Sequence, residues 1–299
     1  MNKWSISLCA LCVLSSITLG VVWSDPVLLT ELNDPANGAA FYPHLSRDRS
    51  TLFFARDDSS NLKRLYTATR NPVTGTFSDI TEISELSEDK NNYTPWVSDD
   101  GLRLYFGRYL GGSTGLRLNQ ASRSSVSDPW GDPLLFTDIH IDGKLDGYPT
   151  LTSDELTMYY VSDRANAADD TRIWMATRSS ITEQFSNLTL VSELDFGNKI
   201  LGPCVLPDGL TIYYAEKTNN QYDLYRATRN TTADPFSNIE GLSVNTPLRI
   251  ESSPYITPDE TELFFTGSDG IYYSYAIPEP ATLALLAVGA GFLRRKNSF

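Results

Sequence analysis

Short apolar strands alternate with polar turns along this chain, and the alternation recurs in five similar units. Each unit starts with a proline, has an aspartate five positions later, and reaches an apolar and aromatic triplet nine to eleven positions after the proline. The prolines are Pro43, Pro95, Pro149, Pro203 and Pro254, and the aspartates are Asp48, Asp100, Asp154, Asp208 and Asp259. The triplets are Leu52-Phe53-Phe54, Leu104-Tyr105-Phe106, Met158-Tyr159-Tyr160, Ile212-Tyr213-Tyr214 and Leu263-Phe264-Phe265. A spacing of 51 to 54 residues between successive prolines identifies an internal repeat, which determines the fold.

Within each unit the pattern predicts strands. Proline followed by a few residues, an aspartate turn and the triplet is typical of a hairpin. Three consecutive apolar positions require both faces of the second strand to be buried, which an isolated hairpin cannot achieve. A small sheet between two identical neighbours can, so the sequence predicts an all-β, five-bladed β-propeller of four-stranded blades. The repeats start near residues 41, 93, 147, 201 and 252. A solenoid is the competing architecture, but its terminal repeats would need distinct caps.

The ends of the repeat array predict how the ring closes. The first and third units end with outer strands that contain Ser84-Glu85-Leu86 and Ser192-Glu193-Leu194, whereas the fifth unit has no such strand. A similar triplet, Thr30-Glu31-Leu32, precedes the first proline. We expect residues 27–32 to form the outer strand of the last blade, because closing the ring in this way removes exposed sheet edges.

The amino terminus has the layout of a secretory signal peptide. Lys3 precedes an apolar run over residues 8–22, and Val22 and Ser24 occupy the −3 and −1 positions of a cleavage site before Asp25. Residues 1–24 are therefore predicted to be a signal peptide, and residues 25–277 the propeller. A retained membrane anchor is the alternative.

The carboxyl terminus combines Pro278, Glu279 and Pro280, an apolar segment over residues 281–293, and a basic end formed by Arg294, Arg295 and Lys296. This order resembles the PEP-CTERM sorting signal of Gram-negative bacteria that make exopolysaccharide. The resemblance implies that residues 278–299 are a sorting signal with a short transmembrane segment, that an exosortase-type enzyme processes it, and that the protein is exported to the cell envelope, the cell surface or the medium. It also implies that only this tail contacts the membrane, before processing. An ordinary tail anchor is the alternative.

Net charge and cysteine content exclude some functions and some kinds of fold stabilisation. Removing Lys3 at one end, and Glu279 with the three basic residues of the tail at the other, changes the formal charge from −13 to −16. Such an acidic domain is not expected to bind nucleic acid, which requires clustered basic residues. Cys204 is the only cysteine in residues 25–277, so a disulfide framework is excluded.

The repeat itself also has a family resemblance. Its turns include Ser98-Asp99-Asp100-Gly101 and Leu206-Pro207-Asp208-Gly209, each followed by an apolar-aromatic strand. They resemble the WD40-like propeller repeats of TolB-type periplasmic proteins. The resemblance implies the fold, but not the function, because such repeats serve many roles. The chain differs from TolB itself in its number of repeats, because TolB has six blades and a further domain whereas this sequence has five units.

Residues repeated in every unit are expected to be scaffold, and function is expected where the units differ, at the mouth of the central channel. Three positions before the proline are Asn92, Asp146 and Glu251, and one position after it are His44, Trp96 and Tyr255. Aromatic rings that stack on a sugar, and carboxylates that accept its hydroxyl protons, would form a ligand site there. A channel that is merely wet and polar is the alternative.

Three functions remain open from sequence. The first is an exported binding or scaffold propeller that recognises a glycan or a protein of the extracellular matrix. The second is a carbohydrate-active enzyme in which Asp146 and Glu251 act as base and acid, and the third is a structural matrix component without a discrete ligand. No nucleophile elbow, zinc motif or phosphate loop is present in the sequence, so no catalytic or metal-binding residue is predicted. Asp57-Asp58 and Asp169-Asp170 could hold Ca²⁺, but they match no calcium loop.

Overall fold

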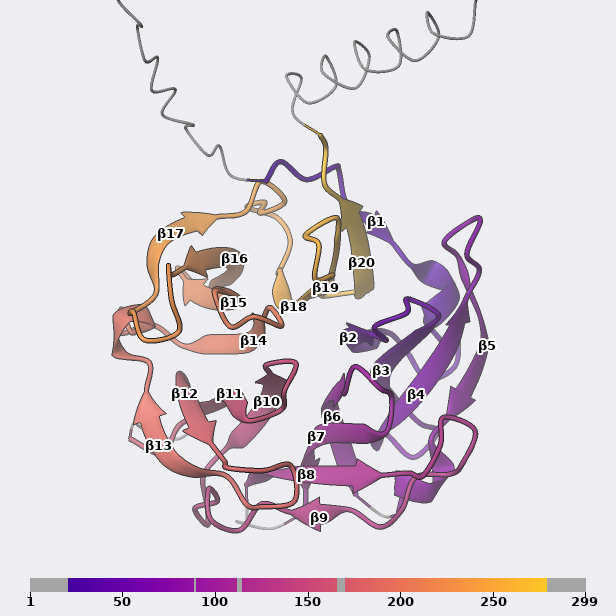
Figure 1. The fold of residues 1–299 in the computed structure, drawn as a ribbon. Helices are drawn as coiled ribbons and strands as arrows, with labels where there is room; N and C mark the ends of the chain where they lie inside the picture. The colour runs from indigo at the N-terminus through magenta and orange to yellow at the C-terminus, as the bar shows by residue number, and fades with distance from the viewer. Residues whose placement is uncertain (1–20, 89, 112–114, 166–169, 279–299) are drawn as a thin grey trace, which may run out of the picture.

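Five four-stranded antiparallel sheets surround a central axis in the computed structural model, which describes residues 21–88, 90–111, 115–165 and 170–278 (Figure 1). Blade 1 contains β2 (Ala40–Leu45), β3 (Thr51–Asp57), β4 (Lys63–Arg70) and β5 (Phe77–Glu82); blade 2 contains β6 (Asn91–Val97), β7 (Arg103–Tyr109), β8 (Leu116–Ser122) and β9 (Leu134–Leu135); blade 3 contains β10 (Asp146–Leu151), β11 (Thr157–Ser162), β12 (Arg172–Thr177) and β13 (Ser186–Leu190); blade 4 contains β14 (Ile200–Val205), β15 (Thr211–Thr218), β16 (Gln221–Thr228) and β17 (Ser237–Gly241); blade 5 contains β18 (Ser252–Ile256), β19 (Glu262–Gly267), β20 (Gly270–Tyr275) and β1 (Val27–Leu28). The strands that carry the repeated prolines are innermost in every blade (Figure 1). The predicted five-bladed propeller is confirmed.

The amino-terminal strand closes the ring, as predicted. β1 pairs with β20 through Val27 opposite Tyr273 and Leu28 opposite Tyr272, so the first and last strands of the propeller share one sheet. The prediction of a continuous strand over residues 27–32 was too long, because Thr30–Leu32 forms a 3-10 helix, η1.

The two related triplets are also 3-10 helices rather than parts of outer strands, namely η2 (Ser84–Leu86) and η3 (Ser192–Leu194). The tighter turn buries the leucine of each triplet completely. It also aims the glutamate at the neighbouring blade, where Glu85 accepts a hydrogen bond from the Trp130 amide at 2.9 Å and Glu193 accepts one from the Phe236 amide at 3.1 Å. The repeated Ser/Thr-Glu-Leu triplet therefore joins blades instead of extending them.

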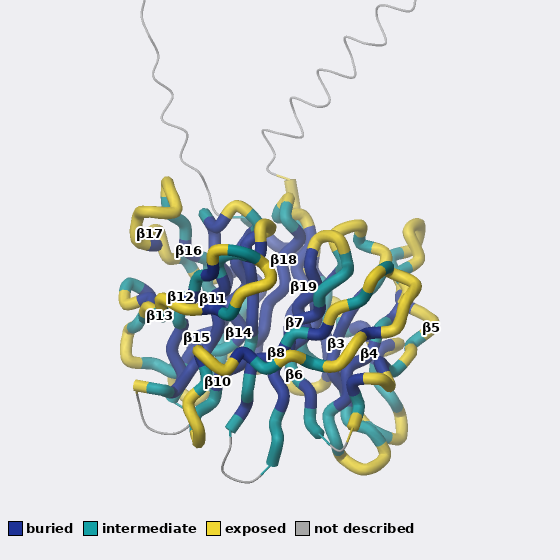
Figure 2. Tube along the Cα trace, turned by 60° about the horizontal axis from the view of Figure 1, so that its bottom comes forward, coloured by how far each residue is buried: buried dark blue, intermediate teal, exposed yellow. Residues whose placement is uncertain are grey.

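Packing between blades is apolar and aromatic. No residue of the five triplets is more than 3% exposed, as expected for strands that are covered on both faces. Figure 2 shows buried residues along the inner strands and exposed residues in the loops and outer strands. Burial of each aromatic side chain contributes about 1.5–3 kcal/mol, so this layer is a main source of stability.

The aspartates of the repeat cap turns. The Oδ1 atom of Asp100 accepts a hydrogen bond from the amide two residues later, that of Leu102, at 3.0 Å. Asp154 Oδ1 accepts one from the Leu156 amide at the same distance. This arrangement is an Asx turn, in which the short carboxylate replaces a backbone acceptor. The residue that follows the aspartate has a positive φ in every blade, between 53° and 72°. These residues are Arg49, Gly101, Glu155, Gly209 and Glu260.

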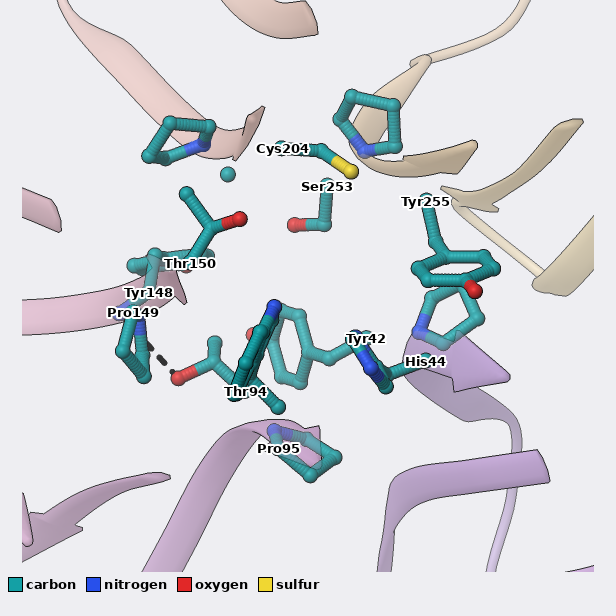
Figure 3. Close-up of a pocket in the computed structure, with 15 residues that line it drawn as sticks. Tyr42, His44, Thr94, Pro95, Tyr148, Pro149, Thr150, Cys204, Ser253 and Tyr255 are labelled. Carbon is teal, nitrogen blue, oxygen red and sulfur yellow. Dashed lines mark hydrogen bonds between the residues drawn. The ribbon is translucent and has the colours of Figure 1, made fainter. Parts of the chain in front are cut away.

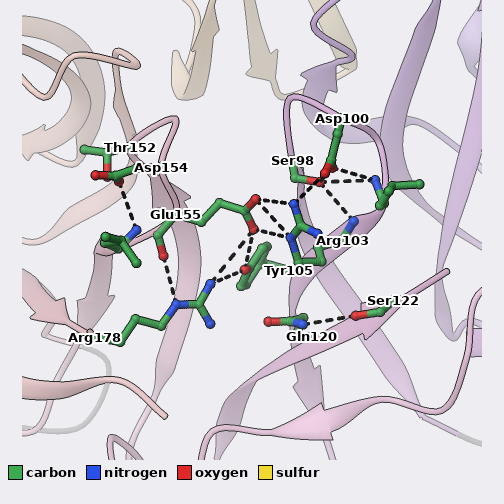
Figure 4. Close-up of polar contacts among 12 residues, drawn as sticks. Ser98, Asp100, Arg103, Tyr105, Gln120, Ser122, Thr152, Asp154, Glu155 and Arg178 are labelled. Carbon is green, nitrogen blue, oxygen red and sulfur yellow. Dashed lines mark hydrogen bonds and ion pairs between the residues drawn. The ribbon is translucent and has the colours of Figure 1, made fainter. Parts of the chain in front are cut away.

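Glu155, in the turn between β10 and β11, reaches across to blade 2 (Figure 4). Its carboxylate accepts hydrogen bonds from Tyr105 Oη at 2.6 Å and from Arg103 Nε at 2.7 Å and Nη2 at 2.6 Å. Arg178, which directly follows β12, donates from Nε to the carbonyl of Glu155 at 2.9 Å and from Nη2 to Tyr105 Oη at 2.6 Å. We call Arg103, Tyr105, Glu155 and Arg178 the Glu155 latch. A similar contact joins blades 4 and 5, where Glu260 accepts from Tyr213 and Arg226.

Candidate functional site

A bulge in each inner strand turns the chain towards the axis. The register of all five inner strands shifts just before the proline, and the residue preceding the proline has a positive φ of 47° to 61°. These residues are Tyr42, Thr94, Tyr148, Gly202 and Ser253. A left-handed conformation before proline is disfavoured, so the surrounding sheet must enforce it. Such bulges redirect side chains, and here they direct Tyr42, Thr94, Tyr148 and Ser253 into the centre of the ring (Figure 3).

The centre of the ring contains a small cavity, which we call the axial cavity. It measures about 40 Å³ and is lined by the bulge residues, the five prolines and the five residues that follow them. The last group is His44, Trp96, Thr150, Cys204 and Tyr255. Ligand pockets typically measure about 300–1,000 Å³, so the axial cavity has room for ordered water but not for a sugar ring.

Three of the predicted site residues, His44, Trp96 and Tyr255, do meet on the axis. The ring centroids of His44 and Tyr255 lie 4.6 Å apart, and those of His44 and Trp96 lie 5.5 Å apart. A second cavity of about 30 Å³ on the turn side is lined by the same three side chains, which therefore form a plug between the two cavities. Burial lowers the pKa of His44 to about 3, so its imidazole is neutral and packs as an aromatic ring.

The other three predicted site residues lie away from the axis. Asn92, Asp146 and Glu251 are completely buried, and none of them lines the axial cavity or the cavity on its turn side. Each is bonded to the segment that connects the preceding outer strand to its own inner strand. Asn92 Nδ2 donates to the carbonyl of Leu86 at 2.9 Å, and the Ile141 amide lies 3.4 Å from Asp146 Oδ2.

Arginines also hold these three side chains. Arg108 Nε donates to Asn92 Oδ1 at 2.9 Å, and Arg164 Nη2 donates to Asp146 Oδ1 at 2.8 Å. In Glu251 the Oε1 atom accepts from Arg249 Nε at 3.0 Å, while Oε2 is buried without a hydrogen-bond partner. Burial raises the pKa of Glu251 to about 7.

A larger pocket opens beside the axis, between blades 2 and 3. It measures about 320 Å³, and four tyrosines line it. We call it the tyrosine pocket, and its lining residues are Tyr42, Tyr93, Tyr109, Gly115, Leu116, Gly143, Leu145, Tyr148 and Asp163. Tyr42 and Tyr148 also line the axial cavity, so the two spaces adjoin.

The tyrosine rings in this pocket are fixed by one another. The rings of Tyr42 and Tyr148 meet edge to face with centroids 5.7 Å apart, and those of Tyr42 and Tyr93 lie 6.3 Å apart. Burial, together with the charge of Asp57, raises the pKa of Tyr93 to about 12 and raises that of Tyr42 as well. Both phenols are therefore protonated at neutral pH and can donate hydrogen bonds to a ligand.

One glycine allows the pocket wall to form. Gly115 has a φ of +73°, and a Cβ atom at this position would collide with the backbone carbonyl of Lys144. The segment before β8 and the segment before β10 can therefore approach each other only with glycine at this place.

Sequence reasoning missed all four tyrosines of the pocket, Tyr42, Tyr93, Tyr109 and Tyr148, as site residues. A usable signal exists in the two positions before the proline, where units one to three have aromatic residues and units four and five have none. Tyr109 ends β7 outside this pattern.

Among the residues that the structure describes, no three His, Cys, Asp or Glu side chains are grouped so that they could hold a metal ion. Asp57 instead pairs with Lys63 Nζ at 2.7 Å, and Asp58 with Arg64 Nε at 2.8 Å. Asp169, part of the other acidic pair, lies outside the described residues.

The carboxyl-terminal residues indicate where the protein is transported. Residues 276–296 match the PEP-CTERM protein-sorting motif. The chain carries a PEP-CTERM sorting signal. This signal indicates export to the cell envelope or surface and implies processing by an exosortase-type enzyme. Within the described part of the chain, no helix is both long and apolar enough to cross a membrane. The predicted membrane segment, residues 1–20 of the predicted signal peptide, and Glu279, Pro280, Arg294, Arg295 and Lys296 of the sorting signal lie outside that part.

No curated protein matches the chain in sequence. Solved propellers match it in structure. TolB from Acinetobacter baumannii is 16% identical with a TM-score of 0.50, over 81% of this chain and 55% of that one. The chain therefore spans only about half the length of that protein. An α-L-arabinofuranosidase from Podospora anserina is 12% identical with a TM-score of 0.58, over 86% of this chain and 97% of that one. A GH62 α-L-arabinofuranosidase from Coprinopsis cinerea is 10% identical with a TM-score of 0.58, over the same shares. At these identities the likeness concerns the fold alone.

Proposed function

We propose that this protein is an exported, glycan-binding propeller of the cell surface or extracellular matrix, and that its tyrosine pocket holds the glycan. The observation that carries the proposal is a pocket of about 320 Å³ lined by four tyrosines beside the axis. Its volume reaches the lower end of the range for ligand sites, whereas the axial cavity is too small. The proposal moves the site from the axis, where the sequence places it, to the interface between blades 2 and 3.

The lining of the pocket suits a saccharide. Tyrosine offers an apolar ring face that stacks on the C–H face of a sugar and a hydroxyl that bonds to its polar groups. Leu116 and Leu145 supply further apolar surface. Tyr42 and Tyr93 retain their phenolic protons at neutral pH, so both can act as donors to sugar hydroxyls.

The charge around the pocket favours a neutral sugar over an acidic one. Asp163 lines the pocket, and the carboxylate of Asp57 is close enough to raise the pKa of Tyr42 and Tyr93. The protein as a whole is acidic, with a formal charge of −13. A uronic acid or sulfated sugar would be repelled, so neutral hexose or pentose oligomers are the expected ligands.

Isothermal titration of the exported protein with neutral oligosaccharides tests the proposal. Tyr93→Ala and Tyr109→Ala should each weaken binding about tenfold, which corresponds to about 1.4 kcal/mol for a lost stacking contact. Tyr93→Phe should keep most of the affinity if stacking dominates. Tyr275→Ala is the matched control, because the side chain of Tyr275 is exposed on β20, in another blade.

Each remaining function predicts a different result. Binding that all the tyrosine variants leave unchanged would place the ligand elsewhere. No binding of any saccharide would favour a structural matrix component or a protein-binding ring. Hydrolysis of the saccharide during titration, seen by product analysis, would support a carbohydrate-active enzyme. The structure does not favour Asp146 and Glu251 for that role, because neither lines the tyrosine pocket or the axial cavity.

A further inference from the structure

The residues just before the predicted signal-peptide cleavage site are part of the closing sheet. Trp23 forms a β-bridge with Ala276, and the Ser24 amide donates to the carbonyl of Tyr275 at 2.8 Å. The Ile277 amide donates to the carbonyl of Val22 at 2.7 Å. The ladder that closes the ring therefore extends beyond β1, back to residue 22.

Side chains in this segment are also integrated into the fold. Trp23 is only 5% exposed and packs in the core that blades 4, 5 and 1 share, and its amide donates to Ser243 Oγ at 3.0 Å. Ser274 Oγ donates to the carbonyl of Ser24 at 2.7 Å, and the Tyr275 amide donates to Ser24 Oγ at 3.1 Å.

Cleavage after Ser24 would undo this arrangement. It would remove a buried tryptophan and leave an apolar void in the core, a large-to-small change without any compensating side chain. It would also leave the buried hydroxyl of Ser274 without its acceptor, and polar groups stranded in this way are destabilising. The strand pairing that closes the ring would then shrink to β1, which is two residues long, and the adjoining bond from the Leu29 amide to the carbonyl of Ile271.

We infer that the leader is removed by hydrolysis of the Gly20–Val21 peptide bond, so that Val21–Ser24 remain in the mature protein. A signal-peptidase-type hydrolase would add water across this bond, leaving the carboxylate on Gly20 and the new α-amine on Val21. The sequence suits this site, because Gly20 at −1 and Thr18 at −3 are small residues near the carboxyl end of the apolar run.

With cleavage at this bond, the site where the leader is removed lies close to the start of the sorting motif. The mature chain would begin next to Val22, whose carbonyl is bonded to Ile277, and the sorting motif begins at residue 276. The leader and the sorting tail would therefore leave the propeller from the same edge of blade 5. Removing the leader would leave that edge paired, so the ring stays closed.

The test is amino-terminal sequencing and intact mass measurement of the protein exported by producing cells. A mature chain that begins at Val21 is expected, and one that begins at Asp25, or an uncut chain, would overturn the inference. Two phenylalanine substitutions compare the candidate bonds: Gly20→Phe places a large residue at −1 of the first, and Val22→Phe places one at −3 of the second. Gly20→Phe should block or displace cleavage, whereas Val22→Phe should leave Val21 as the first residue.

A second measurement depends on whether Trp23 is present in the mature protein. In the exported protein Trp23→Ala should lower the melting temperature by roughly 6–20 °C, as expected when a buried aromatic is truncated. The milder Trp23→Phe is included in case the alanine variant is not recovered, and Trp4→Ala, within the leader, is the matched control. Identical mass and melting temperature in wild type and both Trp23 variants would show that residue 23 had been removed, which refutes the inference.

Discussion

Replacing Glu155 by glutamine tests whether buried polar contacts, as well as apolar packing, hold the blades together. Glu155 is 4% exposed and accepts hydrogen bonds from Arg103 and Tyr105, and Arg178 donates to the same tyrosine hydroxyl (Figure 4). Glutamine keeps the shape of the side chain and removes its charge. The substitution would therefore leave Arg103 and Arg178 facing a neutral amide in a buried site.

The magnitude follows from the burial of the pair. Breaking a buried ion pair by neutralising one partner typically costs about 3–5 kcal/mol. Arg103 keeps a second carboxylate, Asp100, at 2.7 Å, but the side chain of Asp100 is 46% exposed and stabilises the charge only weakly. We therefore expect Glu155→Gln to lower the free energy of unfolding by about 3 kcal/mol. In a domain of this size that corresponds to a fall in melting temperature of about 6–12 °C.

Urea denaturation followed by tyrosine and tryptophan fluorescence measures this free energy. Glu88→Gln is the matched control, because Glu88 is 62% exposed at the side chain and lies 3.6 Å from Arg108. Arg108 is buried, but the Glu88 carboxylate is mostly in solvent, so its contact with Arg108 is expected to contribute less than about 1 kcal/mol. A double-mutant cycle with Tyr105→Phe then measures the coupling across the interface. If Glu155→Gln costs no more than Glu88→Gln, the blades are held by packing alone and the reasoning is refuted.

Two further predictions concern single buried groups. The pKa of Glu251 is about 7 in the folded protein, against an ordinary value of 4.5, so the folded state binds this proton more tightly than the unfolded state. The contribution of protonated Glu251 to the free energy of unfolding should therefore be complete below about pH 4.5 and be lost as the pH rises to about 7. Glu251→Gln should remove that slope, which shows as a difference from wild type in unfolding free energy measured from pH 4 to pH 8, and parallel curves would contradict it. Cys204 is 7% exposed, and burial raises its pKa to about 11. Iodoacetamide should therefore not label this thiol in the native protein at pH 8 but should label it in urea, and rapid native labelling would contradict the prediction.

The sequence predicts the ring well because its strongest signals are local and repeated. The triplets have apolar residues on both faces, and only a strand covered by neighbouring blades satisfies such a pattern. The missing outer strand of the fifth unit and the extra segment before Pro43 then specify the closure through β1. None of these inferences requires knowledge of side-chain geometry.

The site is predicted less well because its geometry depends on an unusual backbone. A residue before proline is expected to be extended, yet Tyr42 and Tyr148 have φ values of 61° and 58°. The resulting bulge separates the residues on either side of it. His44, one position after Pro43, reaches the axis. Asp146, three positions before Pro149, is instead bonded to the segment that connects β9 to β10. Strand alternation alone cannot reveal this change of direction.

The two ends of an inner hairpin take part in different contacts, as β7 shows. It begins with Arg103 of the Glu155 latch and ends with Tyr109 of the tyrosine pocket, about 20 Å away at 3.3 Å per residue. The turn end repeats the same aspartate cap in successive blades. The bulge end differs from blade to blade, because a side chain there faces open space instead of a neighbouring sheet. The bulge ends of blades 1, 2 and 3 supply Tyr42, Tyr93 and Tyr148 to the tyrosine pocket, so substitutions there are expected to alter the pocket without weakening the Glu155 latch.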